Sequence, residues 1–364
     1  RHDVVWMVDH KLPSCSWMSV SNYKEVSNKL TVCSMEYSVI NSPTCVVVEP
    51  NPPAALAPIR VLSYDIEAQP YENGNKTEFP EPHRDPVLTI GVCWFELTSP
   101  DNINKVVFML EPEDPREDPT CYLPSPEEKT DNYDSQDCIV YSFSKELDML
   151  RAFIQFVRKE CQPDIISGYN TDNFDNPYIY RRLSCLASNN KKMSCLKCGV
   201  SHSHLFCHKC GKKHISTSNV DDFKWSYRRD CVSTLKKKYK KSNQTGNFET
   251  FEINVEGFVW MDLIGIIRAD HKLRSYKLDA VASHFLNTRK IHMAYDDIPK
   301  MQRLKAGRIK LAVYCVKDAW LPCILLVNLC KIMNALQMSQ VTGVPLNDIL
   351  HRGQQIRTLV LILT

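Results

Sequence analysis

The sequence predicts an α/β protein in which a mixed sheet is covered by packed helices. Apolar, β-branched runs follow one another at residues 61–66, 87–97 and 105–110, and such runs are typical of consecutive strands. Apolar residues then recur at helical spacing after Ser144, and again around residues 311–321. Strands and helices in this arrangement favour a layered domain with the helices packed on the sheet.

The first residues predict a separate unit. Residues 1–54 contain short apolar runs and lead into a Pro-rich stretch from Pro50 to Pro58. This pattern is typical of the end of a β-rich N-terminal domain followed by a stiff linker. The three strands that come next predict a meander that begins with the strand at 61–66.

A loop and a helix are expected after the meander. Residues 111–139 are dominated by Glu, Asp, Pro and Ser, which predicts a mobile surface loop; a metal reservoir is the less favoured alternative. Ser144 is a candidate N-cap for the helix that follows. Its buried stripe is expected to consist of Leu147, Leu150, Ile154 and Val157.

Composition narrows the class of protein. The 364 residues, 43% hydrophobic and 24% charged, are enough for a large core and two units. A net charge of +3 is too small to indicate nucleic-acid binding without local patches. We find no secretory signal and no eighteen-residue apolar span, so the 16 cysteines are expected to be thiols in a reducing, intracellular setting away from membranes.

The first candidate site is a pair of acids on one strand. Asp65 and Glu67 are two residues apart in the apolar run at 61–66 and its continuation, so both must point to the same face of the sheet. Paired acids on a strand face repel each other unless a cation lies between them, and hard divalent metals fill this role. Two solvated acids at a strand end remain the commoner explanation of such a pair taken alone.

Two later segments carry further acids. A short apolar strand ends at Gly168, turns through polar residues 170–173 and re-enters regular structure at Asp175. Tyr314 and Asp318 are four residues apart in a helical stretch and therefore share a face, and Pro322 is expected to disturb the helix just beyond them.

In this order and in these surroundings, the residues resemble the three motifs of the 3′-5′ proofreading exonuclease of family B DNA polymerases, above all the delta-type enzymes and their viral relatives. The similarity covers about residues 55–364 and includes the stretches 57–67, 79–87, 273–286, 341–345 and 352–356. It implies a ribonuclease-H-like exonuclease domain over residues 55–330 and a helical lead-in to a polymerase palm over residues 331–364.

The resemblance also implies a chemistry, the two-metal hydrolysis of the 3′-terminal phosphodiester of DNA. Asp65 would bridge two Mg²⁺ or Mn²⁺ ions. Glu67 and Asp318 would complete one ion site, and Asp175 would hold the other ion mainly through its waters. Tyr314 would orient the attacking water or the phosphate, because a phenol of pKa about 10 is a poor base near neutrality.

Contacts to DNA are predicted at two places. Asn170 and Phe174 are expected to meet the terminal nucleotide by a hydrogen bond and by stacking, although a turn Asn and a core Phe explain them equally well. A basic run forms either a solvated loop or a contact to the phosphate backbone, and both interpretations stay open. It consists of Lys236, Lys237, Lys238, Lys240 and Lys241. The alternating residues 251–255 beyond it predict a half-buried strand, similar in placement to the hairpin that helps to partition a primer end in related polymerases.

An insert at residues 185–228 carries a separate motif. Two Cys-x-x-Cys-Gly knuckles lie eight residues apart, and they predict one structural zinc in a closed site that serves folding rather than catalysis. The ligands would be Cys195, Cys198, Cys207 and Cys210, with His202, His204, His208 and His214 as substitutes and unmetallated thiols as the alternative.

Some features of the family pattern are missing or altered. The acidic motifs of the polymerase palm do not occur in the sequence, so we expect a fragment that does not polymerise by itself. Ala68 and Asp279 stand where delta-type enzymes commonly carry Cys and Asn. A catalytically silent DNA-binding scaffold is the alternative function, yet a decayed site should have lost one of the four acids or the tyrosine. A ribonuclease of the same fold is a third hypothesis, disfavoured by the polymerase-type stretches.

The expected partners are single-stranded 3′ ends of DNA, primer-template and polymerase accessory subunits, in the nucleus or a viral replication compartment.

Overall fold

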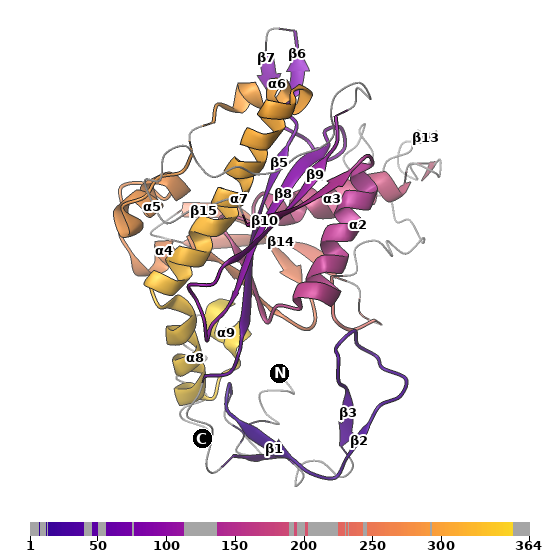
Figure 1. Ribbon diagram of the computed structural model, residues 1–364. Helices are drawn as coiled ribbons and strands as arrows, with labels where there is room; N and C mark the ends of the chain where they lie inside the picture. Colours follow the sequence, from indigo (N-terminus) through magenta and orange to yellow (C-terminus); the bar gives the residue numbers. More distant parts are fainter. Residues whose placement is uncertain are drawn as a thin grey trace.

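A six-stranded mixed sheet lies at the centre of the protein (Figure 1). The structure is a computed structural model, and it describes residues 7, 12, 14–39, 46–49, 56–74, 76–112, 137–188, 193–194, 201–202, 225–229, 231, 233–242, 246–291 and 293–351. The strands of the sheet follow the order β10-β9-β8-β5-β11-β16. Their bounds are Arg60–Ala68 (β5), Val87–Glu96 (β8), Asn104–Leu110 (β9), Cys138–Phe143 (β10), Ile165–Gly168 (β11) and Val259–Asp262 (β16).

The sheet combines a meander with parallel additions on both sides. Strand β5 pairs antiparallel with β8, and β8 pairs antiparallel with β9, as the apolar runs predicted. Strands β10 and β9 are parallel, and so are β11 with β5 and β16 with β11. The acid-bearing strand β5 therefore lies inside the sheet with a neighbour on each side, where its backbone is fixed by hydrogen bonds.

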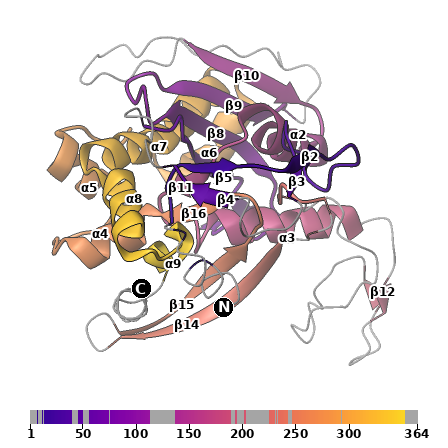
Figure 2. The ribbon, with the colours of Figure 1, turned by 90° about the horizontal axis from the view of Figure 1, so that it is seen from below.

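Helices cover both faces of this sheet (Figures 1 and 2), which confirms the α/β prediction. One face packs against α2 (Glu146–Gln155), its π-helical continuation η1 (Phe156–Cys161) and α3 (Asp175–Ser188). The other packs against the long helix α7 (Lys305–Asn328). The remaining helical elements are α4 (Leu263–Asp270), α5 (Leu278–Leu286), η2 (Tyr295–Asp297), α6 (Ile298–Arg303), α8 (Lys331–Thr342) and α9 (Leu346–His351).

The residues of β5 alternate between the two faces. Leu62, Tyr64 and Ile66 belong to the apolar cluster beneath α2 and α3, whereas Val61 belongs to the cluster beneath α7. Since successive side chains of a strand point to opposite faces, Asp65 and Glu67 point toward α7. The burial of the apolar set thus fixes which helix the two acids meet.

Short two-stranded sheets surround this core. In the N-terminal part, β1 (Met18–Val20) pairs with β4 (Val46–Val48), and β2 (Tyr23–Glu25) pairs with β3 (Tyr37–Val39), which is consistent with the β-rich unit predicted there. Further pairs are β6 (Tyr71–Asn73) with β7 (Lys76–Glu78), β12 (Met193–Ser194) with β13 (Ser201–His202), and β14 (Thr234–Ser242) with β15 (Gly246–Asn254). The domain boundaries and the β-rich identity of residues 1–54 stay predictions.

The start of α2 differs from the prediction. The helix begins at Glu146 with Lys145 at the N-cap position and no side-chain cap, so Ser144 is not the cap. Glu146 is buried, pairs with Arg182 and accepts a hydrogen bond from the backbone amide of Val87, and these contacts fix the first turn.

Other predictions for this region can be compared with the structure. In the expected stripe of α2 and η1, Leu150, Ile154 and Val157 are buried and Leu147 is partly buried. Cys138, which opens β10, falls inside the predicted loop at 111–139, so regular structure resumes earlier than we expected. Residues 113–136 of that loop lie outside the described residues.

Helix α7 passes through Pro322, the predicted point of disturbance, without ending there. The helix continues to Asn328, although proline cannot donate the backbone bond that a helix interior uses. Leu321, Cys323 and Leu325 are fully buried around it, so tertiary packing outweighs the lost bond.

By length and composition alone, helix α7 could span a bilayer, whereas the sequence was predicted to contain no eighteen-residue apolar span. However, 72% of the most apolar part of this helix is buried inside the protein, as in a core helix.

A buried ion pair joins α2 to α3. Arg182 and Glu146 approach to 2.7 Å with side-chain exposures of 10% and 8%. We expect Arg182→Leu to lower the free energy of unfolding by about 3–5 kcal/mol, because it leaves a buried carboxylate without its cation. Arg182→Leu with Glu146→Leu should recover only part of this loss, because the buried Val87 amide then lacks its acceptor. Denaturant titration measures both values.

The control is Arg151→Leu, which breaks the exposed pair with Asp148 and should cost no more than about 1 kcal/mol. An equal effect of Arg182→Leu and Arg151→Leu would show that burial does not decide the cost of breaking these pairs.

Candidate active site

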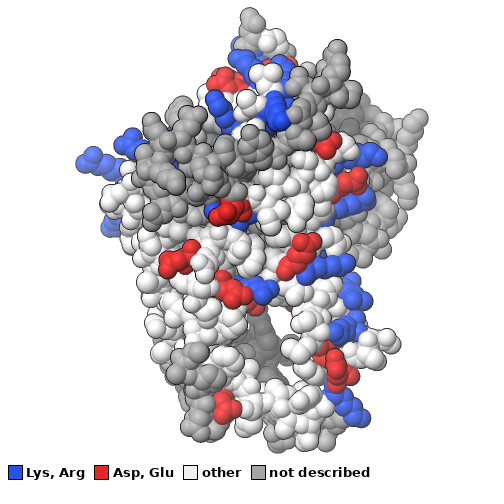
Figure 3. All heavy atoms as spheres, in the orientation of Figure 1, with Lys and Arg blue, Asp and Glu red and all other residues white. Residues whose placement is uncertain are grey.

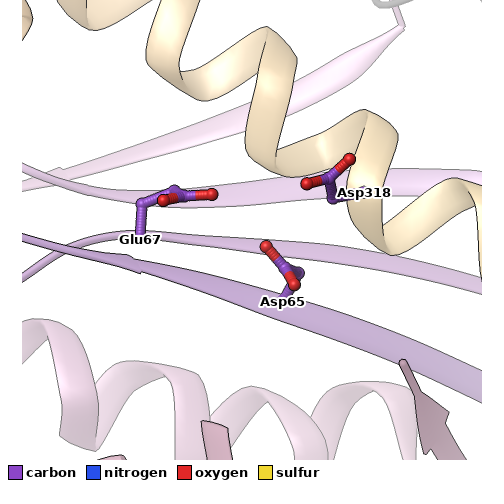
Figure 4. A group of neighbouring side chains, drawn as sticks. All are labelled: Asp65, Glu67 and Asp318. Carbon is purple, nitrogen blue, oxygen red and sulfur yellow. The ribbon is translucent and has the colours of Figure 1, made fainter. Parts of the chain in front are cut away.

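Three carboxylates from two elements converge on one space between β5 and α7 (Figure 4). Asp65 and Glu67 extend from β5, and Asp318 extends from α7 above them. Each offers an oxygen within 4.8 Å of the others, and no other group of three or more metal-ligating side chains meets this condition in the part of the chain that the structure describes. The structure therefore brings together three of the four predicted acids.

Asp175, the fourth acid, lies against the backbone of the same strand. It opens α3 and is 2% exposed, and its Oδ1 accepts a hydrogen bond of 3.0 Å from the amide of Ile66, the residue between Asp65 and Glu67. This bond ties the start of α3 to β5 beside the acids. Asp175 thus borders the site without joining the closest group.

The turn that delivers Asp175 depends on a close approach at Gly168 and on a left-handed backbone conformation at Asn170. Strand β11 ends at Gly168, where a Cβ atom would lie 2.3 Å from the Thr171 side chain and 2.9 Å from the Tyr64 carbonyl oxygen, so only glycine fits without displacement. Asn170 has a φ of 64°, in the left-handed region that asparagine tolerates. Together they turn the chain within a few residues from the end of β11 into α3.

Asp262 supports this turn, although the sequence patterns did not predict it as a site residue. Its Oδ1 accepts hydrogen bonds from the amides of Asn170 (2.8 Å) and Ile264 (3.2 Å), and its Oδ2 accepts one from the amide of Asp172 (3.1 Å). One carboxylate therefore caps α4 and fixes the segment before Asp175. An Asp between an apolar strand and a helix is a recognisable capping signal, but its second role depends on long-range packing.

Lys290 is the other site residue that the sequence patterns did not predict. Its ammonium forms an ion pair with Oδ2 of Asp318 and lies 4.5 Å from the centroid of the Tyr314 ring. It belongs to the connection between α5 and η2, where no periodicity or motif marks it. Tyr314 and Asp318 share one side of α7, as predicted, and both meet this cation.

The pKa values of the acids are raised. Burial, followed by the charges of Asp175 and Asp318, raises the pKa of Asp65 well above its ordinary value. Burial, followed by Asp318, raises the pKa of Glu67 to about 8. Burial raises the pKa values of Asp175 and Asp318 to about 7 and about 6. Burial alone would lower the pKa of Lys290, but Asp318 and Asp65 raise it well above its ordinary value.

This arrangement fits divalent cations. Carboxylate oxygens are the ligands that Mg²⁺ and Mn²⁺ prefer, and raised acid pKa values indicate negative charge that is incompletely compensated in the protein alone. The charge of Lys290 lowers the pKa values of all four acids, and that of Lys317 lowers the pKa of Asp318, yet all four pKa values remain raised. Asp65, Glu67, Asp318 and Asp175 could therefore hold metal ions that complete the balance.

An aromatic pocket adjoins the Asp175 segment. The Phe79 ring lies 5.6 Å from that of Phe174 and is stacked on Tyr295 at 6.1 Å, and Phe79 is 66% exposed. Phe79 and Phe174 line a cavity of about 540 Å³. Phe174 is partly buried against the core, whereas the Asn170 side chain accepts a hydrogen bond from Asn173. Both residues thus have structural roles, and Phe174 also faces open space.

The basic run lies on a strand, so the solvated-loop interpretation is wrong. Lys236, Lys237 and Lys238 belong to β14, which pairs with β15 over its whole length, and their side chains are exposed; Lys240 and Lys241 follow on the same strand.

The neighbouring strand of this hairpin agrees with its prediction. The half-buried strand expected around residues 251–255 is confirmed in β15, where Ile253 is buried. The Arg181 guanidinium, from α3, lies 4.8 Å from the Phe251 ring and connects the hairpin to that helix.

Surface charge adds little to the evidence for a nucleic-acid site. In the view of Figure 3, Lys and Arg side chains are interspersed with Asp and Glu over the described surface, in keeping with the net charge of +3. The four predicted zinc ligands, Cys195, Cys198, Cys207 and Cys210, lie outside the described residues.

Comparisons with known proteins point to one family. A family model described as DNA polymerase family B, exonuclease domain, matches residues 4–244. The DNA polymerase delta catalytic subunit of Bos taurus is 32% identical over 366 residues, which cover 98% of this chain and 28% of that protein. That of Candida albicans is 31% identical over 361 residues, covering 97% of this chain and 29% of that protein.

A solved structure shares the fold. The family B DNA polymerase from the archaeon Pyrobaculum calidifontis aligns with a TM-score of 0.58 at 21% identity, over 100% of this chain and 35% of that chain. In the sequence comparison above, the chain spans about 28% of the length of the delta subunit of Bos taurus.

The raised pKa of Glu67 generates a stability prediction. Because its pKa is about 8 in the folded protein and about 4.3 when unfolded, ionisation destabilises the fold, and the penalty grows as pH rises from about 4 to about 8. We expect Glu67→Gln to raise the free energy of unfolding of the metal-free protein by at least about 1 kcal/mol at pH 8, with little effect at pH 4.5. Thermal unfolding in EDTA across this range measures the gain.

Glu25→Gln, at an exposed position on β2, is the matched control and should be neutral throughout. A gain for Glu67→Gln that is constant with pH would contradict ionisation of the partly buried Glu67 carboxyl as its cause.

Proposed function

Because this chain belongs to DNA polymerase family B and carries its exonuclease domain, we propose that it removes nucleotides from the 3′ end of DNA by metal-dependent hydrolysis. The observation that carries this proposal is the convergence of Asp65, Glu67 and Asp318 within 4.8 Å, with Asp175 bonded to the strand beside them. Four acids that meet in a folded core are costly unless they bind cations, so the arrangement favours a catalytic over a purely structural role.

The acids would divide between two ions. Asp65, Glu67 and Asp318 would hold one Mg²⁺ or Mn²⁺ ion, and Asp65 with Asp175 would hold a second. When bound, such ions neutralise a phosphodiester, lower the pKa of water and stabilise a leaving 3′ oxygen. The protein contributes rigid placement, since β5 lies inside the sheet and α7 is buried along most of its length.

Tyr314 and Lys290 would act on the substrate beside the acids. Burial raises the pKa of the Tyr314 phenol well above its ordinary value, so the group stays protonated and orients water or a phosphate oxygen as a hydrogen-bond donor. The Lys290 ammonium keeps its charge. Once ions compensate the acids, it can turn from Asp318 toward the negatively charged phosphate.

The surrounding surfaces suit a frayed single strand. The aromatic faces of Phe79 and Phe174 can stack an unpaired terminal base, and Asn170 lies in the adjoining turn. The exposed lysines of β14 can contact the phosphate backbone. With these contacts, the exonuclease proofreads for a replicative polymerase with accessory subunits, in the nucleus or a viral replication compartment.

A silent DNA-binding scaffold is the second candidate. The same fold and surfaces would serve it, but it gives no reason for four acids to retain this geometry. A single assay of nuclease activity distinguishes the two functions.

We expect the purified chain with Mg²⁺ to shorten single-stranded DNA stepwise from the 3′ end. A 5′-labelled strand should give a descending ladder, whereas a 3′-labelled strand should release labelled mononucleotide at once. Asp65→Asn with Glu67→Gln should lower the rate about a thousandfold or more, because the metal ligands supply several kcal/mol of transition-state stabilisation.

Asp101→Asn, an exposed acid in the turn between β8 and β9, is the control and should leave the rate unchanged. A folded protein without activity would favour the scaffold, and full activity in the doubly substituted protein would exclude the mechanism.

We further propose that the insert binds one zinc ion through Cys195, Cys198, Cys207 and Cys210, in a closed site that supports folding. The reduced, dialysed protein should contain about one equivalent of zinc by elemental analysis. Cys195→Ser with Cys198→Ser should abolish the signal, whereas Cys231→Ser, outside the knuckles, should not. Less than about a tenth of an equivalent in soluble protein would favour free thiols.

A further inference from the structure

The contact between α7 and the sheet is very close next to the first acid. Asp65 on β5 and Gly91 on β8 are paired across the two strands, and both face α7. A Cβ atom at Gly91 would lie 2.6 Å from the Cys315 carbonyl oxygen and 2.8 Å from the Val316 nitrogen, so the helix backbone rests directly on the strand backbone. Because glycine has no side chain, nothing at position 91 separates helix α7 from the sheet.

The thiol of Cys315 connects the same three elements. Its sulfur lies 3.3 Å from the backbone oxygen of Asp65 and 4.0 Å from Oδ2 of the same residue. The amide of Gly91 donates to the sulfur at 3.1 Å. The thiol proton can therefore be donated to the Asp65 carbonyl while the sulfur accepts from β8.

Asp318 follows Cys315 by three residues, hence about one turn farther along the same rigid helix. Any shift of α7 relative to β5 at Cys315 would move the Asp318 carboxylate relative to Asp65 by a similar amount. A shared ion tolerates little such change, since metal–oxygen distances are fixed within about 0.2 Å.

We propose that Cys315 is a positioning residue whose contacts to Asp65 and Gly91 set the distance between the acids of β5 and the acid of α7, and so the affinity of the site for divalent ions. The proposal rests on the proposed metal-dependent function. In this proposal Cys315 is a ligand of neither ion and does not bind the substrate. It acts through the placement of Asp65 and Asp318.

Cys323 provides a matched control on the same helix. It is also fully buried, and its sulfur lies 3.7 Å from the carbonyl oxygens of Cys93 and Ala319. It stands eight residues beyond Cys315 and contacts none of the acids in any described interaction. Removal of either sulfur therefore takes a similar amount of core packing from α7, but only one removal loosens the site.

The first measurement is Mn²⁺ binding by calorimetry, from which the binding that remains in Asp65→Asn is subtracted as background. The second is the Mg²⁺ concentration that gives half-maximal nuclease activity. Cys315→Ala should weaken Mn²⁺ binding about tenfold and raise the Mg²⁺ requirement in parallel, as substitutions of residues that orient metal ligands do. Cys323→Ala should change the Mn²⁺ affinity and the Mg²⁺ requirement by no more than about twofold. Its loss of thermal stability should be similar to that of Cys315→Ala. Cys315→Ser, which keeps a donor, should recover part of the affinity.

Equal Mn²⁺ affinities in Cys315→Ala and Cys323→Ala, with the unsubstituted protein active, would overturn the proposal and leave the proposed function intact. Should Cys315→Ala fail to fold, Cys315→Val fills the space of the sulfur with methyl groups that cannot donate, and its Mn²⁺ affinity is compared with that of Cys323→Ala in the same way. An unsubstituted protein that neither binds Mn²⁺ at Asp65 nor digests DNA would overturn both.

Discussion

Electrostatic repulsion among four acids in one partly enclosed space is the condition around which this structure is organised. Asp65, Glu67 and Asp318 lie within 4.8 Å of each other, and Asp175 is bonded to the strand between the first two. Without cations such a group opposes folding, as the raised pKa values of its members indicate. The surrounding fold must therefore be stable enough to maintain it.

That stability comes from the way the acids are mounted. Strand β5 is paired on both sides, and its alternate residues Leu62, Tyr64 and Ile66 are buried under α2 and α3, so a shift in register would expose them. Helix α7 approaches β8 closely enough at Gly91 that only glycine fits. The Asp262 carboxylate fixes the turn before Asp175. Each acid is thus attached to an element whose position is decided by packing elsewhere.

Sequence patterns predicted the parts of this arrangement that depend on local order. Apolar runs predicted the meander of β5, β8 and β9, period two placed Asp65 and Glu67 on one face, and helical spacing placed Tyr314 beside Asp318. Errors arose where contacts between residues far apart in the sequence determine the local structure. Ser144 does not cap α2, because a buried ion pair fixes the start of that helix. Pro322 was expected to disturb α7, and the helix continues through it because the core surrounds it. Lys290 and Cys315 contact the acids only through the tertiary fold, and no spacing rule marks them. A capping signal marks Asp262 at the start of α4, but not its contact with the turn before Asp175.

Lys290 offsets only part of the negative charge of the four acids, and we expect divalent ions to offset the rest. The proposed chemistry depends on these ions. Anomalous diffraction from crystals grown with Mn²⁺ locates such ions directly. We expect Mn²⁺ density among Asp65, Glu67 and Asp318, together with displacement of the Lys290 ammonium from the Asp318 carboxylate. An intact Lys290–Asp318 ion pair with no Mn²⁺ density at saturating concentration would show that the acids are balanced without metal and that the proposed site is wrong.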